Sequence, residues 1–236
     1  MESILHHIKV SQKQNLAVLI DPDKFNLNNT SQFIDKVNKS IATHIFVGGS
    51  TVKDYATEKL LKIIKPLTTL PIVLFPGDIL QVSEEADAIL FLSLVSGRNP
   101  EYLIGQQVKA VSKLRDSKLE VIPTAYILID GGKETSTQKV TNTKPLTNVL
   151  EIVDTAKASE LLGMQLVYLE AGSGAKKEVS TKIIEAVKNN INIPLIVGGG
   201  IRSKLAIENA FKSGANMVVI GTAFEEDETF FEELKK

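Results

Sequence analysis

Acidic and hydroxyl side chains follow the first two short apolar runs of the sequence. Asp21 and Asp23 come directly after the first run, and Ser50 comes after the second, behind two glycines. Mg²⁺ commonly takes one or two carboxylates and completes its shell with water and phosphate oxygens, so these side chains could hold it. Asp-Pro-Asp is also good turn chemistry without a metal. Lys24, the next residue, could bind a phosphate or be an ordinary surface lysine, and both interpretations stay open.

Glycine-rich segments follow the last three apolar runs. They read Glu170-Ala171-Gly172-Ser173-Gly174, Gly198-Gly199-Gly200 and Gly221-Thr222. Glycines let backbone N–H groups approach an anion closely, and a helix beginning near Ser203 would add its positive end. The same glycines could serve as simple turns, but three consecutive loops favour a phosphate cradle. The segment Gly172–Gly174 lacks a third glycine at the G-x-G-x-x-G spacing, which argues against a dinucleotide site.

Glu170 is an unusual residue inside this cradle. A carboxylate beside a phosphate-binding backbone is unfavourable unless it has a task, such as orienting or deprotonating a substrate hydroxyl. The alternative is a salt bridge to a neighbouring cation such as Arg202. The run Leu166–Glu170 contains no lysine, so a Schiff-base aldolase is disfavoured. Tyr126 and Phe75 could line an apolar slot or simply pack in the core.

Eight apolar runs alternate with longer amphipathic stretches. The expected strands are Leu16–Ile20, His44–Val47, Ile72–Leu74, Ala88–Leu94, Glu120–Leu128, Leu166–Leu169, Leu195–Val197 and Met217–Ile220. The expected helices include Thr51–Ile64, Glu101–Lys113, Thr147–Leu162, Ser180–Asn189 and Ser203–Ser213. Continuously apolar strands are typical of parallel sheets covered on both faces. The order predicts an α/β protein with a single (β/α)8 TIM-type barrel; an open doubly wound sheet is the alternative.

Two connections depart from this alternation. Residues 75–87 hold at most a short helix, so the third β/α unit is expected to be abbreviated. Residues 130–145 are long and polar and are expected to form a functional or mobile loop. The active site of a barrel forms at the carboxyl ends of its strands, where the segments described above would gather. The three histidines lie at the N-terminus and the amino end of strand two, which argues against a histidine-based site.

Length and composition fit one soluble domain spanning residues 1–236. Barrels of this class run to about 250 residues, and 43% of this chain is hydrophobic. The absence of cysteine excludes disulfides, thiolate metal sites and a cysteine nucleophile. A net charge of -1 argues against nucleic acid as a principal partner. No apolar run approaches the roughly 20 residues of a transmembrane segment, and no signal-peptide core is seen, so a cytoplasmic protein is expected.

The strand-end segments together resemble the geranylgeranylglyceryl phosphate synthase family of prenyltransferases. The resemblance runs in order over nearly the whole chain, through LIDPDK (19–24), FVGGS (46–50), YLEAGSGA (168–175), VGGGIRS (197–203) and IGT (220–222). YLEAGSGA followed by GGGIRS and GT is the specific part. SGRNP (96–100) and VTNTKPL (140–146) resemble the branch found in archaea and some bacteria.

The resemblance implies condensation of sn-glycerol 1-phosphate with a polyprenyl diphosphate, here expected to be geranylgeranyl diphosphate, with Mg²⁺ as cofactor. It implies Asp21 and Ser50 as the magnesium site, and Glu170 with Tyr168 as catalytic residues. The implied substrate-binding residues are Lys24, Tyr168, Leu169, Glu170, Ala171, Gly172, Ser173, Gly174, Gly199, Gly200, Gly221 and Thr222.

Donor length and assembly are less constrained by the sequence. Family members often carry a tryptophan shortly after the NP pair, near the tail groove. This chain has no tryptophan, and Tyr102 is the nearest aromatic residue there. Members are often dimers or larger, so a homo-oligomer is expected, with Phe224, Phe230 and Phe231 as a candidate contact.

Two other functions stay in competition. A different phosphate-binding barrel, such as an isomerase or synthase acting on a phosphorylated metabolite, explains GGGIRS and GT equally well. It does not explain LIDPDK and YLEAGSGA together. A non-catalytic sensor of a phosphorylated metabolite is the second alternative, and Glu170 inside the cradle argues against it.

Overall fold

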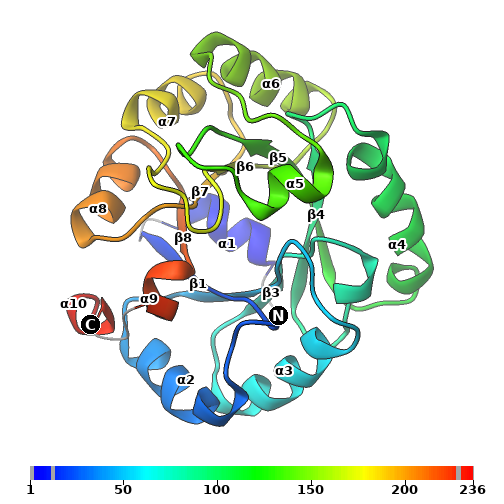
Figure 1. Cartoon of the computed structure of the whole chain (residues 1–236), viewed down its shortest axis with the longest axis vertical. Helices are drawn as coiled ribbons and strands as arrows, with labels where there is room; N and C mark the ends of the chain where they lie inside the picture. The colour runs from blue at the N-terminus through cyan, green and yellow to red at the C-terminus, as the bar shows by residue number, and fades with distance from the viewer. Residues whose placement is uncertain (1–2, 12–13, 227–229, 236) are drawn as a thin grey trace.

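The computed structural model describes residues 3–11, 14–226 and 230–235, and its eight parallel strands form one closed barrel (Figure 1). Strands that are consecutive in the chain are neighbours in the barrel, and β8 closes against β1. The strands are β1 Asn15–Ile20, β2 His44–Val47, β3 Ile72–Leu74, β4 Ala88–Leu94, β5 Glu120–Leu128, β6 Leu166–Glu170, β7 Leu195–Gly198 and β8 Met217–Ile220. The predicted barrel is confirmed, and every strand agrees with its expected bounds to within one residue.

Helices surround the barrel (Figure 1). The longer ones are α2 Thr30–Lys39, α3 Ala56–Ile64, α4 Gln106–Leu114, α6 Val149–Leu161, α7 Thr181–Lys188 and α8 Lys204–Lys212. Shorter segments are the 3₁₀ turns η1 Leu27–Asn29 and η2 Lys65–Leu67 and the π-helical segment η4 Glu101–Gly105. The side chains of Ser180 and Ser203 cap α7 and α8 by accepting backbone N–H bonds. Both serines stand at the start of the helices expected from the sequence.

The third β/α unit is abbreviated, as predicted. Between β3 and β4 the described chain contains a single three-residue 3₁₀ turn, η3 Ile79–Gln81. Asp78 begins this turn by accepting the backbone N–H of Leu80 at 2.8 Å. The turn is anchored to α4, because Gln106 Oε1 accepts the N–H of Ile79 and Lys113 Nζ donates to its carbonyl. The chain therefore leaves this side of the barrel without a full covering helix of its own.

The segment 130–145 is not wholly a loop, in contrast to the prediction. It contains the helix α5 Ser136–Thr141, which lies in front of the strands in Figure 1. The helix begins with a capping box, in which Thr135 accepts the N–H of Gln138 and Gln138 accepts the N–H of Thr135. Six residues are too few to show a helical period, so only this cap marked the helix in the sequence.

A short N-terminal helix, α1 Ile4–Val10, covers the amino end of the barrel and lies behind the strands in Figure 1. Ile4 and Ile8 are buried in the cluster that fills the barrel interior. The carboxylate of Glu120, the first residue of β5, accepts the N–H groups of Ile4 and Leu5 at 2.5 and 3.0 Å. A helix this short is unstable alone, so these contacts hold it in place.

The phenylalanines near the C-terminus are buried within their own chain. Phe224, in α9 Thr222–Glu226, stacks on Phe231, in α10 Phe230–Glu233, with ring centroids 4.1 Å apart. Phe231 also meets the edge of Phe33 on α2. The expectation that these rings contact a second subunit is therefore wrong, because they complete the core between the barrel and α2. Among the described residues, no helix combines the length and apolar character needed to cross a bilayer.

Candidate active site

A cavity of about 300 Å³ opens at the carboxyl ends of the strands. Its lining gathers most of the predicted site residues: Asp21, Lys24, Ser50, Tyr168, Glu170, Ser173, Gly199, Gly200, Gly221 and Thr222. Four others, Leu169, Ala171, Gly172 and Gly174, do not line it. The side chains of Leu169 and Ala171 belong instead to the core cluster shared with the surrounding helices.

Glu170 ends β6 and is buried, with 5% of its surface exposed. Its Oε1 accepts the backbone N–H of Gly172 at 2.6 Å. Burial raises the pKa of Glu170 to about 7, although the Gly172 hydrogen bond and the neighbouring Tyr168 oppose the shift. Such a carboxyl group exchanges its proton near neutral pH, as a general base for a substrate hydroxyl should.

Tight packing of two loops explains the glycine at position 199. Its φ is +82°, and a Cβ there would lie 2.2 Å from Glu170 Oε1 and 2.5 Å from the nitrogen of Gly172. The loops after β6 and β7 can therefore meet only without a side chain at this position. Nearby, the hydroxyl oxygens of Ser173 and Thr222 lie 3.4 Å apart. Backbone N–H groups and hydroxyls at this rim make a surface suited to a phosphate.

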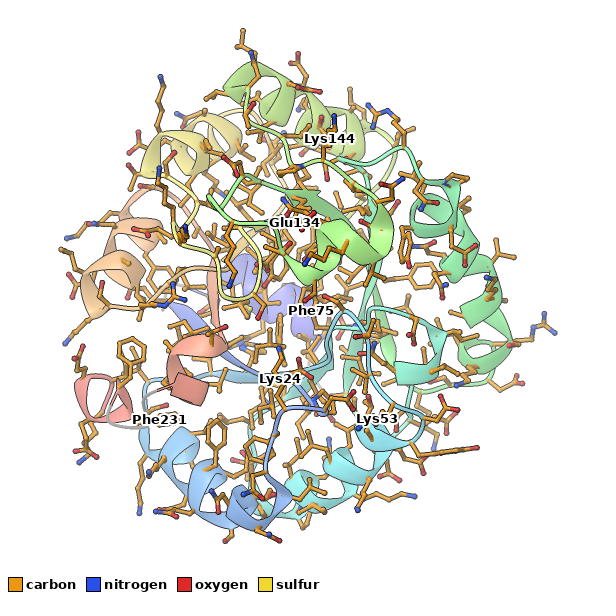
Figure 2. The ribbon with its side chains drawn as sticks, viewed as in Figure 1. Lys24, Lys53, Phe75, Glu134, Lys144 and Phe231 are labelled. Atoms are coloured by element: carbon orange, nitrogen blue, oxygen red, sulfur yellow. The ribbon has the colours of Figure 1, made fainter. Side chains whose placement is uncertain are left out.

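Tyr168 lies beneath the cradle, and its ring is part of an aromatic cluster. The ring stacks on Phe75, which Figure 2 shows near the middle of the barrel mouth, with centroids 5.1 Å apart. Tyr126 meets its edge at 5.5 Å. The buried Tyr168 hydroxyl has no hydrogen-bond partner among the described residues, although Glu170 is close enough to influence it. Burial, followed by the charge of Glu170, raises the pKa of Tyr168 well above 10, so it stays a proton donor.

Asp21 lies at the cavity directly after β1, the strand that pairs with β8. Its Oδ2 is ion-paired with Lys24 Nζ at 2.8 Å, and its Oδ1 accepts the N–H of Asp23 at 3.1 Å. Asp23 also lines the cavity, and its carboxylate accepts the N–H of Lys53, so it joins the loop after β1 to the loop after β2. Lys24 and Lys53 are labelled at this side of the mouth in Figure 2.

Ser50 follows β2 and faces the same cavity. Its hydroxyl lies 3.0 Å from that of Thr137 on α5, a contact that the sequence did not reveal. Within the described part of the chain, no group of three or more histidine, aspartate or glutamate side chains is placed to hold a metal ion. One carboxylate and one hydroxyl nevertheless fit Mg²⁺, which usually keeps several waters and is completed by substrate phosphates.

An apolar arm of the cavity extends over the abbreviated third unit. Its lining comes from η3, β4, η4, α4 and α5 and includes Ile79, Val82, Leu92, Tyr102, Ala110 and Val140. This arm exists because η3 replaces a full helix between β3 and β4. An apolar chain buried here would gain about 25 cal/mol per Å² of surface removed from water. The cavity thus joins a phosphate-suited cradle to an apolar groove.

Comparison with known proteins places this geometry in a family. The family model described as the PcrB family matches residues 8–236. The chain is 53% identical over 230 residues to a geranylgeranylglyceryl phosphate synthase of Zunongwangia profunda, covering 97% of each chain. It is 38% identical to the protein of that name from Pyrococcus furiosus, covering 98% of this chain and 92% of that one.

Solved structures give the same result. The crystal structure of (S)-3-O-geranylgeranylglyceryl phosphate synthase from Thermoplasma acidophilum, in complex with its substrate sn-glycerol-1-phosphate, superposes with a TM-score of 0.93 at 34% identity, covering 99% of this chain and 96% of that one. A thiamine phosphate pyrophosphorylase from Pyrococcus furiosus superposes with a TM-score of 0.60 at 13% identity, covering 93% of each chain. That second likeness shows the barrel fold alone.

Proposed function

The chain belongs to the PcrB family, and we propose that it is a prenyltransferase that joins sn-glycerol 1-phosphate to geranylgeranyl diphosphate. One observation carries the proposal: the buried carboxylate of Glu170 lies in a glycine-rich cradle that continues into an apolar groove. The names of the relatives and the substrate of the Thermoplasma acidophilum protein support the same reaction. Neither an isomerase nor a sensor of phosphorylated metabolites needs the apolar groove.

Glu170 acts as the base in this reaction. A glycerol hydroxyl oxygen forms a bond to the first carbon of the prenyl chain, the bond from that carbon to the diphosphate breaks, and the hydroxyl proton passes to Glu170. A pKa of about 7 lets the carboxylate take this proton and return it to water. The buried Tyr168 hydroxyl, without a partner among the described residues, supplies a hydrogen bond to the glycerol oxygens.

The cradle fixes the glycerol phosphate beside the groove, so positioning is a large part of catalysis. Its phosphate is held by Ser173, Thr222 and the backbone of the loops around Gly199. Gly172 and Gly174 contribute through the shape of the loop rather than through the cavity lining. Lys24 adds a positive charge beside Asp21, after β1, where the diphosphate of the donor would lie.

We further propose that Asp21 and Ser50 would hold Mg²⁺ at this side of the cavity. When bound, the ion would stabilise the negative charge that develops on the departing diphosphate. The chemistry of the donors supports this assignment, because carboxylate and hydroxyl oxygens are ligands that Mg²⁺ accepts. The ammonium of Lys24, 2.8 Å from Asp21, can neutralise the same diphosphate.

Two properties of the whole protein belong to the same proposal. We propose a homo-oligomer, and the outer face of α4 and its preceding turn supports it, since Ile104, Val108 and Val111 are 59%, 65% and 44% exposed on one helical face. A second copy covering this stripe would remove it from water. Light scattering on the purified protein tests the assembly. The cysteine-free sequence fits a cytoplasmic enzyme.

The proposed function is tested by incubating the protein with Mg²⁺, sn-glycerol 1-phosphate and geranylgeranyl diphosphate. Diphosphate release and lipid product should appear with this enantiomer and not with sn-glycerol 3-phosphate, and EDTA should stop both. Donors of other lengths then show how far the groove extends past Tyr102. Binding of glycerol phosphate without product from a donor of any length would contradict the proposal and favour the sensor.

A further inference from the structure

The side chain of Gln81 is buried in η3, with 1% of its surface exposed, and it does not line the cavity. Its amide makes a pair of hydrogen bonds with one residue, Gly49. The N–H of Gly49 donates to Gln81 Oε1 at 3.0 Å, and Gln81 Nε2 donates to the carbonyl of Gly49 at 2.8 Å. The orientation of the amide is fixed by this pairing, because a backbone N–H can only donate.

This pairing is costly to replace. A buried amide is tolerated only when its polar atoms are hydrogen-bonded, and here one amide satisfies a donor and an acceptor of the main chain at once. The turn that carries Gln81 is itself anchored to α4 through Gln106 and Lys113. Gln81 therefore ties the loop after β2 to a fixed part of the barrel.

The loop that Gln81 holds is packed tightly on both sides. A Cβ on Gly49 would lie 3.1 Å from the carboxyl atoms of Asp21. A Cβ on Gly77 would lie 2.4 Å from the carbonyl oxygen of Gly49 and 2.6 Å from that of Ser50. The backbone of Gly49 and Ser50 is thus enclosed between Asp21 on one side and Gly77 on the other. A shift of this backbone would displace Ser50 and the surface against which Asp21 rests.

We propose that Gln81 is a positioning residue, which through its paired hydrogen bonds to Gly49 holds Ser50 and Asp21 in the relative placement that binds a divalent cation together with diphosphate. The inference rests on the proposed function, because it takes Asp21 and Ser50 as the cation site. Gln81 acts through Gly49 and does not itself line the cavity.

The test measures cation binding directly. Mn²⁺, which prefers the same oxygen ligands as Mg²⁺, is titrated into the full-length protein with inorganic diphosphate, and unbound Mn²⁺ is followed by electron paramagnetic resonance. Gln81→Met keeps the length of the side chain and removes both hydrogen bonds. Removing such a supporting contact weakens metal affinity by about 10–100-fold, and we expect a loss in that range. Gln165→Met, on an exposed glutamine at the amino end of β6, is the matched control and should bind like the wild type.

Kinetics separate positioning from a general loss of structure. Gln81→Met should raise KM for geranylgeranyl diphosphate and leave KM for sn-glycerol 1-phosphate unchanged, because the cradle lies on β6 to β8. Equal changes in both constants, or unchanged Mn²⁺ affinity in a folded variant, would overturn the inference.

A second variant keeps the test decisive if Gln81→Met does not fold. Gln81→Glu has the same shape, and its protonated form again offers one donor and one acceptor to Gly49. Its Mn²⁺ affinity relative to wild type should recover as the pH is lowered, and a constant ratio would count against the inference. Asp21→Asn distinguishes a wrong cation site from a wrong role for Gln81. If Asp21→Asn binds Mn²⁺ like the wild type, both the cation site and the inference fail. If Asp21→Asn alone loses Mn²⁺, only the role of Gln81 fails.

Discussion

A carboxylate base works only while it is ionised, and burial raises the pKa of Glu170 to about 7. Turnover should therefore increase with pH through about 7 and level off above it. Glu170→Gln removes the base and should lower kcat by about 10²–10⁴-fold, the usual contribution of general base catalysis. Initial rates of diphosphate release at saturating substrates, measured between pH 5.5 and 8.5, check both expectations.

The matched control is Glu185→Gln, which changes an exposed carboxylate on α7. It should keep the rate and the pH profile of the wild type. An unchanged pH step in Glu170→Gln would show that another group titrates, and the role of Glu170 as base would then be wrong.

Gly199 offers a test of the cradle at the scale of one methyl group. In Gly199→Ala the new Cβ would meet Glu170 Oε1 at 2.2 Å, so the loops after β6 and β7 must separate. A displacement of about 1 Å in a site can cost about 10²-fold in rate. We expect a loss of this order in kcat/KM for sn-glycerol 1-phosphate, measured at saturating prenyl diphosphate.

Gly163→Ala controls for the backbone strain alone. Gly163 also has a positive φ, +93°, but no atom lies within 4 Å of its added Cβ. Both variants should lose about 1–2 kcal/mol of stability to the left-handed conformation. If Gly163→Ala lost activity as Gly199→Ala does, strain rather than the contact with Glu170 would be the cause.

Site residues near the ends of strands could be predicted from the sequence, and those in the connections could not. Asp21 and Ser50 lie just after strands and Glu170 ends one, so the barrel order alone brings them to one rim. Gln81 and Thr137 lie in connections, and their contacts with Gly49 and Ser50 span 32 and 87 residues. Nothing in the local sequence marks such pairs.

At the scale of elements, the strands were predictable and the short helices α1 and α5 were not. Continuous β-branched runs marked β1 to β8 because parallel strands are covered on both faces. Helices α1 and α5, with seven and six residues, are too short to show a period and are held by contacts outside themselves. For α5 the capping box of Thr135 and Gln138 was the available signal.

The dependence of α1 on Glu120 gives a prediction at this scale. Glu120→Ala leaves the N–H groups of Ile4 and Leu5 without their carboxylate acceptor. Unsatisfied groups of this kind cost about 1–3 kcal/mol. We expect urea unfolding to shift by this amount and the amides of α1 to exchange faster with deuterium.

Turnover should not change in Glu120→Ala, because α1 lies at the amino end of the barrel and the cavity at the other. Lys9→Ala, on an exposed side chain of the same helix, should leave both stability and exchange unchanged. Loss of activity together with undocking of α1 would show that the two ends of the barrel are coupled.

At the scale of the whole molecule, two buried titratable groups lie at opposite ends of the barrel. Glu170 is at the carboxyl end, and His44 begins β2 at the amino end. Burial, together with the nearby His7, lowers the pKa of His44 from 6.5 to about 3. Its ring lies 5.7 Å from that of His7, and Nδ1 is 2.8 Å from Thr43 Oγ1.

These two groups should oppose each other in the pH dependence of stability. Stability rises with pH wherever the unfolded state binds more protons than the native state. Glu170 keeps a proton in the native state between about pH 4.5 and 7, so its contribution falls as the pH rises. His44 gains a proton only on unfolding between about pH 3 and 6.5, so its contribution rises with pH. Between pH 4.5 and 6.5 the two effects should nearly cancel.

Single variants should expose the two opposing slopes. Relative to wild type, the free energy of unfolding of Glu170→Gln should rise by about 1.4 kcal/mol per pH unit. That of His44→Leu should fall relative to wild type by about the same amount per pH unit. Urea unfolding between pH 4.5 and 6.5 measures both. The double variant should return to the wild-type slope, because it lacks both opposing contributions. Parallel curves for all four proteins would mean that the fold shifts neither pKa.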